Sequence, residues 1–462
     1  MNEMILGVIV SVLIGGVFAL AWLATLTHRR LAITLIVLSI LGPAIPTPFI
    51  RIRPEELVVL VLLPFILARL RTRWNRIDVC FGLVGVSTVL SMLWGTIGKG
   101  ISFSPRDLME LVKLAKFWVF FRLALYRWTE DDLGSITRWL VGSMGLAALI
   151  GIVQGNNFLG IGGLTKAFYG QDLGHVESDR VIGTMTSPIY FSMLMATGMA
   201  FAVNVEGGYR RRLFSMVLAG LYGVASVLTI SRSGILGMVV ALAVVVGLRL
   251  AMRPDALHRR LGRVMGLLIV LAVVGLISGT WLLGQLESLE GANEWELLRY
   301  ARQGLLYRMV ARFSESEESR DIRVSIWQEN LENFSQSPIL GWGPAKSSQA
   351  TVTDNGYVLT LRRYGLLGMA CYLLLYWQVL RFCWKLLHAY PYRSPQWTMA
   401  LSILSVTAAY LASNVFIETF YELQLMSLFW LMVGVGYSSA LVDLQPGHDK
   451  AGQAEKECTS SS

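Results

Sequence analysis

Apolar residues in this chain are gathered into long runs separated by short polar segments. Runs of about 17–25 apolar residues cross a bilayer as helices, because lipid leaves no other partner for the backbone polar groups. We predict spans at 4–26, 31–49, 57–70, 78–97, 107–126, 136–154, 189–206, 213–230, 235–250, 264–284, 364–387, 397–415 and 424–443. The run at 57–70 is short enough to be re-entrant or interfacial. The prediction is therefore an all-α, polytopic membrane protein with 12 or 13 transmembrane helices.

The loop arginines predict the orientation of these spans. One alternating set of short loops carries most of them, including Arg29-Arg30, Arg210-Arg211-Arg212 and the segment 253–263. Basic residues are enriched in cytoplasmic loops, so we expect this set to face the cytoplasm. The segments 155–188, 231–234 and 285–363 then lie on the outer side of the membrane.

Four regions follow from this pattern. Residues 1–284 hold transmembrane helices with short loops, 285–363 form a large outer loop, 364–443 hold the last helices, and 444–462 form a polar tail that we expect to be disordered. Within the outer loop, amphipathic helices are predicted at 294–313 and 321–335. In the second of these we expect Ile322, Ile326, Leu331 and Phe334 to face inward.

Composition and charge agree with a membrane protein and exclude other classes. Apolar residues make up 54% of the chain and charged residues only 15%. The net charge of +9 is explained by the cytoplasmic arginines, so no nucleic-acid partner is expected. The four cysteines are scattered and match no metal-ligand spacing, and we predict neither a metal nor a cofactor.

Arg232 is the most informative single residue. It lies in Ser231-Arg232-Ser233-Gly234, between two long apolar runs, on the side from which loop arginines are normally depleted. Arg180 and Arg323 are predicted to lie in the same outer layer. The planar guanidinium group suits bidentate phosphate binding. We therefore predict that these arginines bind a lipid-linked phosphate or pyrophosphate at the outer leaflet, with Asp354 as a nearby base.

Simpler interpretations of the same residues stay open. Arg180 also fits an ordinary loop arginine that precedes a turn. Thr353 or Asp354 also fits the N-cap of the helix that follows.

The order of these motifs resembles the O-antigen ligase and O-antigen polymerase superfamily. The matching features are listed in chain order: Arg180-x-x-Gly183-Thr184, Ser231-Arg232-Ser233-Gly234, Arg323-x-x-x-Trp327, Pro338-Ile339-Leu340-Gly341-Trp342-Gly343, Asp354-Asn355-x-Tyr357 and Gly365-Leu366-Leu367-Gly368. The resemblance implies a metal-independent, inverting glycosyltransferase that takes a glycan from undecaprenyl pyrophosphate and transfers it to a sugar hydroxyl. It also implies catalytic roles for Arg232 and Asp354, pyrophosphate or glycan binding by Arg180, Arg232, Arg323 and Asn355, and membrane lipid, a flippase and a chain-length regulator as partners.

Ligases of this superfamily tend to carry His-Asn where this chain has Asp354-Asn355. The difference favours a polymerase of lipid-linked repeat units, with a ligase that uses lipid A-core as the alternative. A small-anion transporter is less favoured, because such a path needs ionisable groups inside the spans. Glu110 and Lys113 come closest, but they sit near a helix start with the spacing of an i, i+3 pair. An envelope scaffold is the remaining interpretation.

Overall fold

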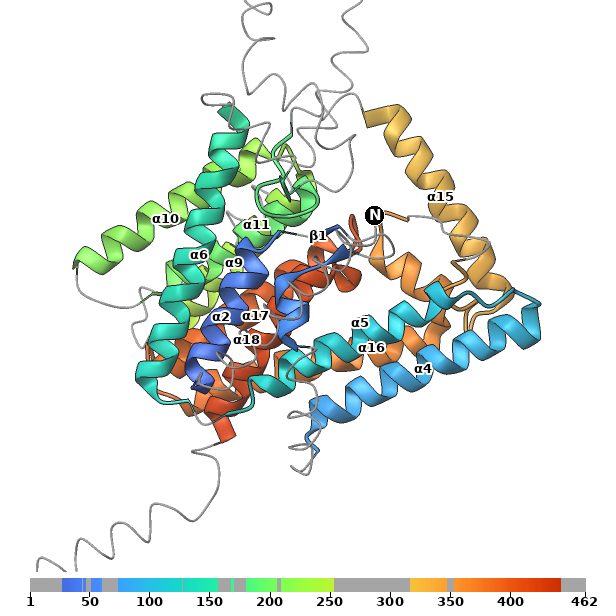
Figure 1. Ribbon diagram of the computed structural model, residues 1–462, viewed down its shortest axis with the longest axis horizontal. Helices are drawn as coiled ribbons and strands as arrows, with labels where there is room; N and C mark the ends of the chain where they lie inside the picture. Colours follow the sequence, from blue (N-terminus) through green and yellow to red (C-terminus); the bar gives the residue numbers. More distant parts are fainter. Residues whose placement is uncertain are drawn as a thin grey trace, which may run out of the picture.

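The computed structural model describes residues 27–43, 45–46, 51–59, 74–126, 128–156, 168–169, 180–205, 209–252, 316–346 and 353–441, and almost all of its regular structure is helical (Figure 1). The long helices are α2 (His28–Leu41), α4 (Arg76–Lys99), α5 (Pro105–Leu123), α6 (Glu130–Asn156), α9 (Pro188–Asn204), α10 (Tyr209–Leu228), α11 (Arg232–Ala251), α15 (Ser316–Gln336), α16 (Gly356–Ala389), α17 (Pro395–Ser413) and α18 (Leu423–Leu441). A short 3₁₀ helix, η2 (Thr419–Tyr421), precedes α18. The all-α prediction is confirmed.

One predicted span is wrong in its second part. Helix α2 ends at Leu41, and the antiparallel pair β1 (Ile45–Pro46) and β2 (Arg51–Ile52) follows within the run predicted at 31–49. Pro43 and Pro46 remove backbone donors, so the apolar run cannot continue as a helix. The run 4–26, most of 57–70 and the run 264–284 lie outside the described residues, as does the predicted helix at 294–313. The count of 12 or 13 spans therefore stays a prediction.

Contacts between helix ends show how several helices are arranged in the bundle. At one end of the bundle, Gln424 at the start of α18 donates to the Ser39 carbonyl oxygen near the end of α2 (2.6 Å), and the Trp94 indole near the end of α4 donates to Ser337 (2.9 Å). At the opposite end, Arg29 of α2 contacts Asp132 of α6 (3.5 Å). In the predicted topology, the first of these two layers of helix ends is the outer one and the second is cytoplasmic.

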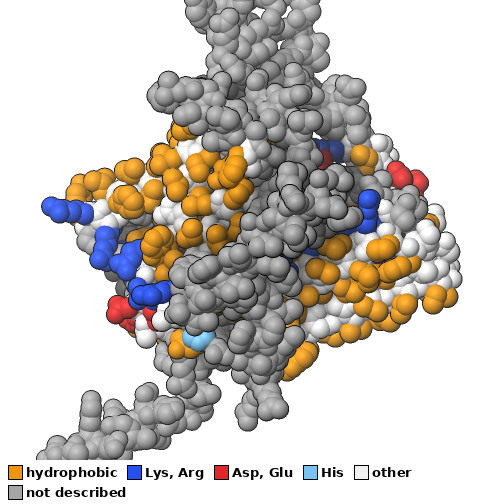
Figure 2. Space-filling view, viewed as in Figure 1, with side chains coloured by type: hydrophobic (Ala, Val, Ile, Leu, Met, Phe, Trp, Pro, Cys, Tyr) orange, Lys and Arg blue, Asp and Glu red, His pale blue; other side chains and the backbone are white. Residues whose placement is uncertain are grey.

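Apolar side chains remain exposed along several helices, as expected of a chain surrounded by lipid. Five helices of the described part are long and apolar enough to cross a membrane: α4, α6, α10, α11 and α16. Figure 2 shows apolar side chains spread over the outside of the bundle, with basic side chains gathered at the left edge. On α4 the exposed residues include Leu83, Val86, Leu90 and Ile97. Their spacing marks one continuous helix face that would contact lipid.

A kink in α16 holds part of the outer loop against the bundle. Gly365 has a φ of 62° inside this helix, which interrupts the helical hydrogen bonds. The released amides of Leu366 and Leu367 donate to the carbonyl oxygens of Pro338 (2.8 Å) and Ile339 (3.1 Å). On the other side of the kink, the amides of residues 342 and 343 donate to the carbonyl oxygens of residues 362 and 363, at 2.9 and 2.8 Å. We call these four bonds between 338–343 and 362–367 the glycine clasp.

Candidate functional site

The joint between α10 and α11 turns one arginine out of an otherwise buried motif. Ser231 caps α11 by accepting the Gly234 amide (3.2 Å), and Ser231, Ser233 and Gly234 are buried. A Cβ at Gly234 would overlap Ser192 of α9, so only glycine permits this close packing. Arg232 alone is exposed. The local fold therefore presents its guanidinium group at the end of the bundle where α10 and α11 meet.

The segment that follows Arg180 is held against this joint. The Arg180 Nε donates to the Thr229 carbonyl oxygen (3.1 Å), just before the Ser-Arg-Ser-Gly motif. Gly183 has a φ of 57°, and both of its backbone groups bond to the Gln154 side-chain amide at 2.8 Å. Two motifs separated in the sequence thus meet through Thr229, and a buried glutamine of α6 fixes their position.

Helix α15 corrects the predicted inward face of this segment at Leu331, while Ile326 and Phe334 are partly buried. Leu331, expected to face inward, is 43% exposed, whereas Asn330 is buried. Arg323, Trp327 and Asn330 share one face at helical spacing, and the Trp327 indole donates to the Thr353 carbonyl oxygen (2.7 Å). Apolar periodicity failed to predict this face because the helix contacts polar groups of another segment there, as Trp327 does at Thr353.

The predicted site residues of the outer loop meet Arg232 through Arg323. The Arg323 Nε lies 3.3 Å from a carboxylate oxygen of Asp354, and both side chains are partly exposed. Arg323 is also close enough to Arg232 for the two positive charges to repel each other. Arg180, Arg232, Arg323 and Asp354 therefore gather at one end of the described bundle. Two like charges held together near a single carboxylate favour the binding of an additional anion.

Asn355, and neither Thr353 nor Asp354, is the N-cap of α16. Its Oδ1 accepts the amides of Tyr357 (3.0 Å) and Val358 (3.1 Å), and the residue is 6% exposed. Asp354 takes a left-handed conformation, with a φ of 49°, which leaves its carboxylate facing Arg323. The capping alternative considered from the sequence was wrong by one residue because it ignored this turn.

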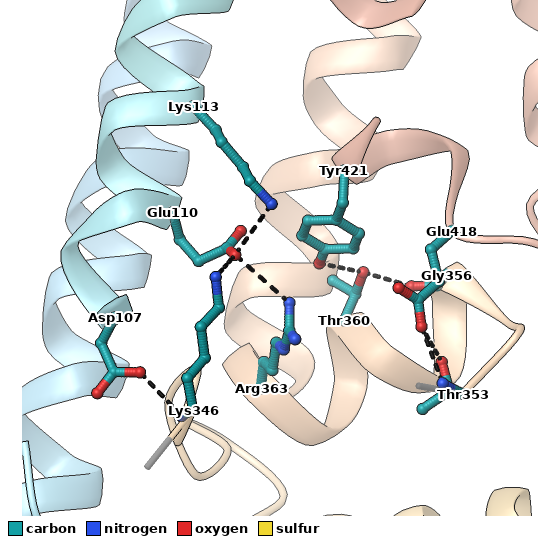
Figure 3. A network of polar contacts seen from close by, with 10 residues as sticks. All are labelled: Asp107, Glu110, Lys113, Lys346, Thr353, Gly356, Thr360, Arg363, Glu418 and Tyr421. Carbon is teal, nitrogen blue, oxygen red and sulfur yellow. Dashed lines mark hydrogen bonds and ion pairs between the residues drawn. The ribbon is translucent and has the colours of Figure 1, made fainter. Parts of the chain in front are cut away.

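Glu418 is a neighbour of Asp354 that the sequence analysis missed. Its Oε1 accepts both the amide (2.8 Å) and the hydroxyl (2.9 Å) of Thr353, next to Asp354 in the chain. Figure 3 shows this contact at the start of α16. Glu418 lies in a short outer loop between α17 and α18, where no motif singled it out.

A second charged cluster lies on the same side of the bundle (Figure 3). The Glu110 Oε1 of α5 contacts the Lys113 Nζ (3.3 Å), the Arg363 Nη1 (3.8 Å) and the Lys346 Nζ. Lys346 also donates its backbone amide to Asp107 (2.9 Å). We call Glu110, Lys113, Lys346 and Arg363 the Glu110 cluster. The i, i+3 pair expected from the sequence is confirmed, but its two further cations became visible only in the fold.

Together, these features define a class of protein: a multi-pass helical membrane protein with charged groups gathered at one end of its bundle. Comparison with known proteins adds a family match for part of the chain. Residues 214–373 match the family model described as O-antigen ligase, which confirms the resemblance predicted from the motifs. No curated protein matches the chain.

The matched segment contains Arg232, Arg323, Asp354 and Asn355 together with both halves of the glycine clasp, while Arg180 precedes it. The match thus covers most of the predicted site residues but less than half of the chain.

Proposed function

We propose that this protein polymerises lipid-linked oligosaccharide repeat units at the periplasmic face of the bacterial inner membrane. The donor would be a glycan on undecaprenyl pyrophosphate, and the acceptor would be a hydroxyl of the terminal sugar on the next lipid-linked unit. The observation that carries the proposal is that Arg323 pairs with Asp354 and also lies within electrostatic range of Arg232, while Arg180 is held at Thr229, just before the Arg232 motif.

The arginines would stabilise the negative charge of the leaving pyrophosphate group. During transfer, the bond between the sugar C1 and the pyrophosphate oxygen breaks, and negative charge grows on that oxygen. Arg232 and Arg323 would stabilise this charge, and Arg180 would support the joint that presents Arg232. Fixed cations at a developing negative charge contribute strongly to catalysis, and here they would take the part that a divalent metal plays elsewhere.

Asp354 is placed to meet the acceptor. As the acceptor hydroxyl attacks C1 from the face opposite the leaving group, its proton would pass to the Asp354 carboxylate and then to solvent. The ion pair with Arg323 orients this carboxylate toward the arginines. Asn355, as the N-cap of α16, holds the backbone that carries Asp354. Its proposed contact with the glycan would add to this capping role.

The test is a reconstituted reaction. Purified protein incubated with a lipid-linked repeat unit should yield oligosaccharide ladders on undecaprenyl pyrophosphate, with and without a chelator. We expect Arg232→Ala to reduce product by roughly 100-fold or more, as expected for a charge that stabilises the leaving group. Loss of product on chelation, or a normal ladder from Arg232→Ala, would contradict the proposed mechanism.

A ligase is the second candidate, because the matching family model carries that description. A ligase would use the same donor and transfer the glycan to lipid A-core. In a deletion strain, loss of the ladder with one capped unit retained would identify the polymerase. Loss of every capped core molecule would identify the ligase.

A further inference from the structure

The Glu110 cluster carries more positive than negative charge at a single point. Three cations, from α5, the outer loop and α16, contact the same oxygen, Oε1 of Glu110. The carboxylate is almost fully buried, with 3% of its side chain exposed, whereas the side chains of Lys113 and Lys346 are 22% and 20% exposed. The buried Glu110 carboxylate therefore holds the three cations from the protein interior. The ammonium groups of Lys113 and Lys346 stay partly exposed to solvent.

The surrounding groups carry charges of both signs: Asp107 accepts the Lys346 backbone amide, and Glu418 lies within electrostatic range of Arg363. Lys116 is paired with Glu56 (2.6 Å), while Arg53, Glu55 and Glu422 border the same region. Burial raises the pKa of the Glu55 carboxyl and that of the Glu422 carboxyl, which reduces the negative charge that they supply. Burial also lowers the pKa of Lys346, against the attraction of Glu110. Lys113, Lys346 and Arg363 still share a single carboxylate oxygen, and this arrangement favours an additional bound anion.

Unpartnered donors support the same conclusion. The Nε of Arg363 and the Nη1 of Arg53 are buried and have no hydrogen-bond partner among the described residues, as is also true of both carboxylate oxygens of Glu55. A guanidinium group is normally satisfied when it is buried, because an unpaired charged donor is costly. A phosphoryl group brings several acceptor oxygens and would satisfy donors of this kind.

The Glu110 cluster and the arginine site are joined through the start of α16. Arg363 lies eight residues after Asn355, about 12 Å along a helix that rises about 1.5 Å per residue. Arg363 also lies over the Tyr421 ring, 5.4 Å from its centroid, and the Tyr421 hydroxyl bonds to Thr360 (2.8 Å; Figure 3). The separation leaves room for sugar residues between two phosphate groups, one at each site.

We propose that Lys113, Lys346 and Arg363, held by Glu110, form a second phosphate-binding site that receives the phosphoryl groups of the acceptor lipid. The assignment rests on the proposed function, because a polymerase must bind two lipid-linked substrates at once. The donor pyrophosphate occupies the arginine site, and the acceptor phosphate is held at the Glu110 cluster. The acceptor phosphate belongs either to a second undecaprenyl pyrophosphate or to lipid A.

A binding experiment on the full chain tests this without turnover. The probe is radiolabelled undecaprenyl pyrophosphate, titrated against purified protein in detergent. We expect two binding classes per chain. Arg232→Ala should remove one class. Lys346→Gln and Lys113→Gln should each weaken the other about tenfold, the effect of one charged hydrogen bond. The matched control is Arg106→Gln, an exposed cation one turn before Glu110 on α5, which should change neither class.

The class that survives in Lys346→Gln and Lys113→Gln also reports that these variants are folded. Competition by lipid A at the Lys346-dependent class alone would assign the acceptor to a ligase reaction, whereas resistance to it would assign a second undecaprenyl-linked unit. A single binding class whose affinity is unchanged by both lysine substitutions would overturn the second site. Competition by phosphatidylglycerol as strong as that by unlabelled undecaprenyl pyrophosphate would overturn it as well. Failure of the proposed function would appear separately, as absence of transfer by the unmodified protein.

Discussion

At the scale of single residues, the site depends on which side chains the backbone turns outward. Arg232 is exposed between buried neighbours, and Asp354 faces Arg323 because its own backbone is left-handed. An asparagine tolerates a left-handed backbone, so Asp354→Asn changes the chemistry and spares the fold.

We expect Asp354→Asn to lower transfer by roughly 100-fold or more while protein level is unchanged, because the amide cannot accept the acceptor proton. Turnover with the reconstituted protein measures this effect. If the variant keeps full activity, Glu418 becomes the stronger candidate for the base. The same assay on Glu418→Gln would then decide between the two carboxylates.

Asn355 offers a way to separate capping from catalysis. Its Oδ1 accepts two amides at the start of α16, so Asn355→Ala should lower the stability of the protein by about 1 kcal/mol. Asn355→Asp keeps a capping oxygen and should retain the melting temperature. Thermal unfolding in detergent compares the two. Equal melting temperatures for the alanine variant and the unmodified chain would exclude the cap as a source of stability.

At the scale of elements, the glycine clasp joins two motifs of the outer loop to α16. A Cβ at Gly365 would overlap the Ile339 carbonyl group, and the left-handed φ adds about 1–2 kcal/mol of strain for alanine. We therefore expect Gly365→Ala to destabilise the protein by more than this amount and to abolish transfer. Thermal unfolding and turnover measure the two effects.

The control is Gly142→Ala in α6, where a Cβ would meet open space. Alanine favours a helix over glycine, so this variant should keep its stability or gain slightly. Similar melting temperatures for Gly142→Ala and Gly365→Ala would mean that the clasp does not hold the outer loop in place.

Gln154 has a comparable task for the segment that follows Arg180. Gln154→Leu would leave two buried backbone groups of Gly183 without partners, each at a cost of about 1–3 kcal/mol. We expect lower stability and a loss of activity that exceeds the fall in protein level, because Arg180 would lose its position beside Thr229. Activity per folded molecule that matches the unmodified protein would contradict this role.

At the scale of the whole molecule, the two layers of helix ends predict opposite accessibility across the membrane. Ile339 is 67% exposed in the outer loop, and Tyr209 is 81% exposed at the start of α10, in the predicted cytoplasmic layer. In a chain without its native cysteines, Ile339→Cys should react with an impermeant maleimide in intact spheroplasts. Tyr209→Cys should react only after permeabilisation. The reverse pattern would put the proposed site on the cytoplasmic side.

Several features followed from the sequence alone because they depend on local chemistry. Long apolar runs predict helices in lipid, and the arginine distribution predicts which loops share a side. Arg232 was recognisable because a charge at that boundary conflicts with both trends. The order of short motifs was enough to predict the family that the comparison then matched over residues 214–373.

Only the tertiary structure decided which charges meet. Glu110 and Arg363 are separated by most of the chain, and their contact depends on how α5 and α16 pack. The inward face of α15 could not be predicted from periodicity either, because it depends on a polar partner from another segment. Local pattern determines what a segment can form, whereas the partners that satisfy a buried polar group come from anywhere in the chain.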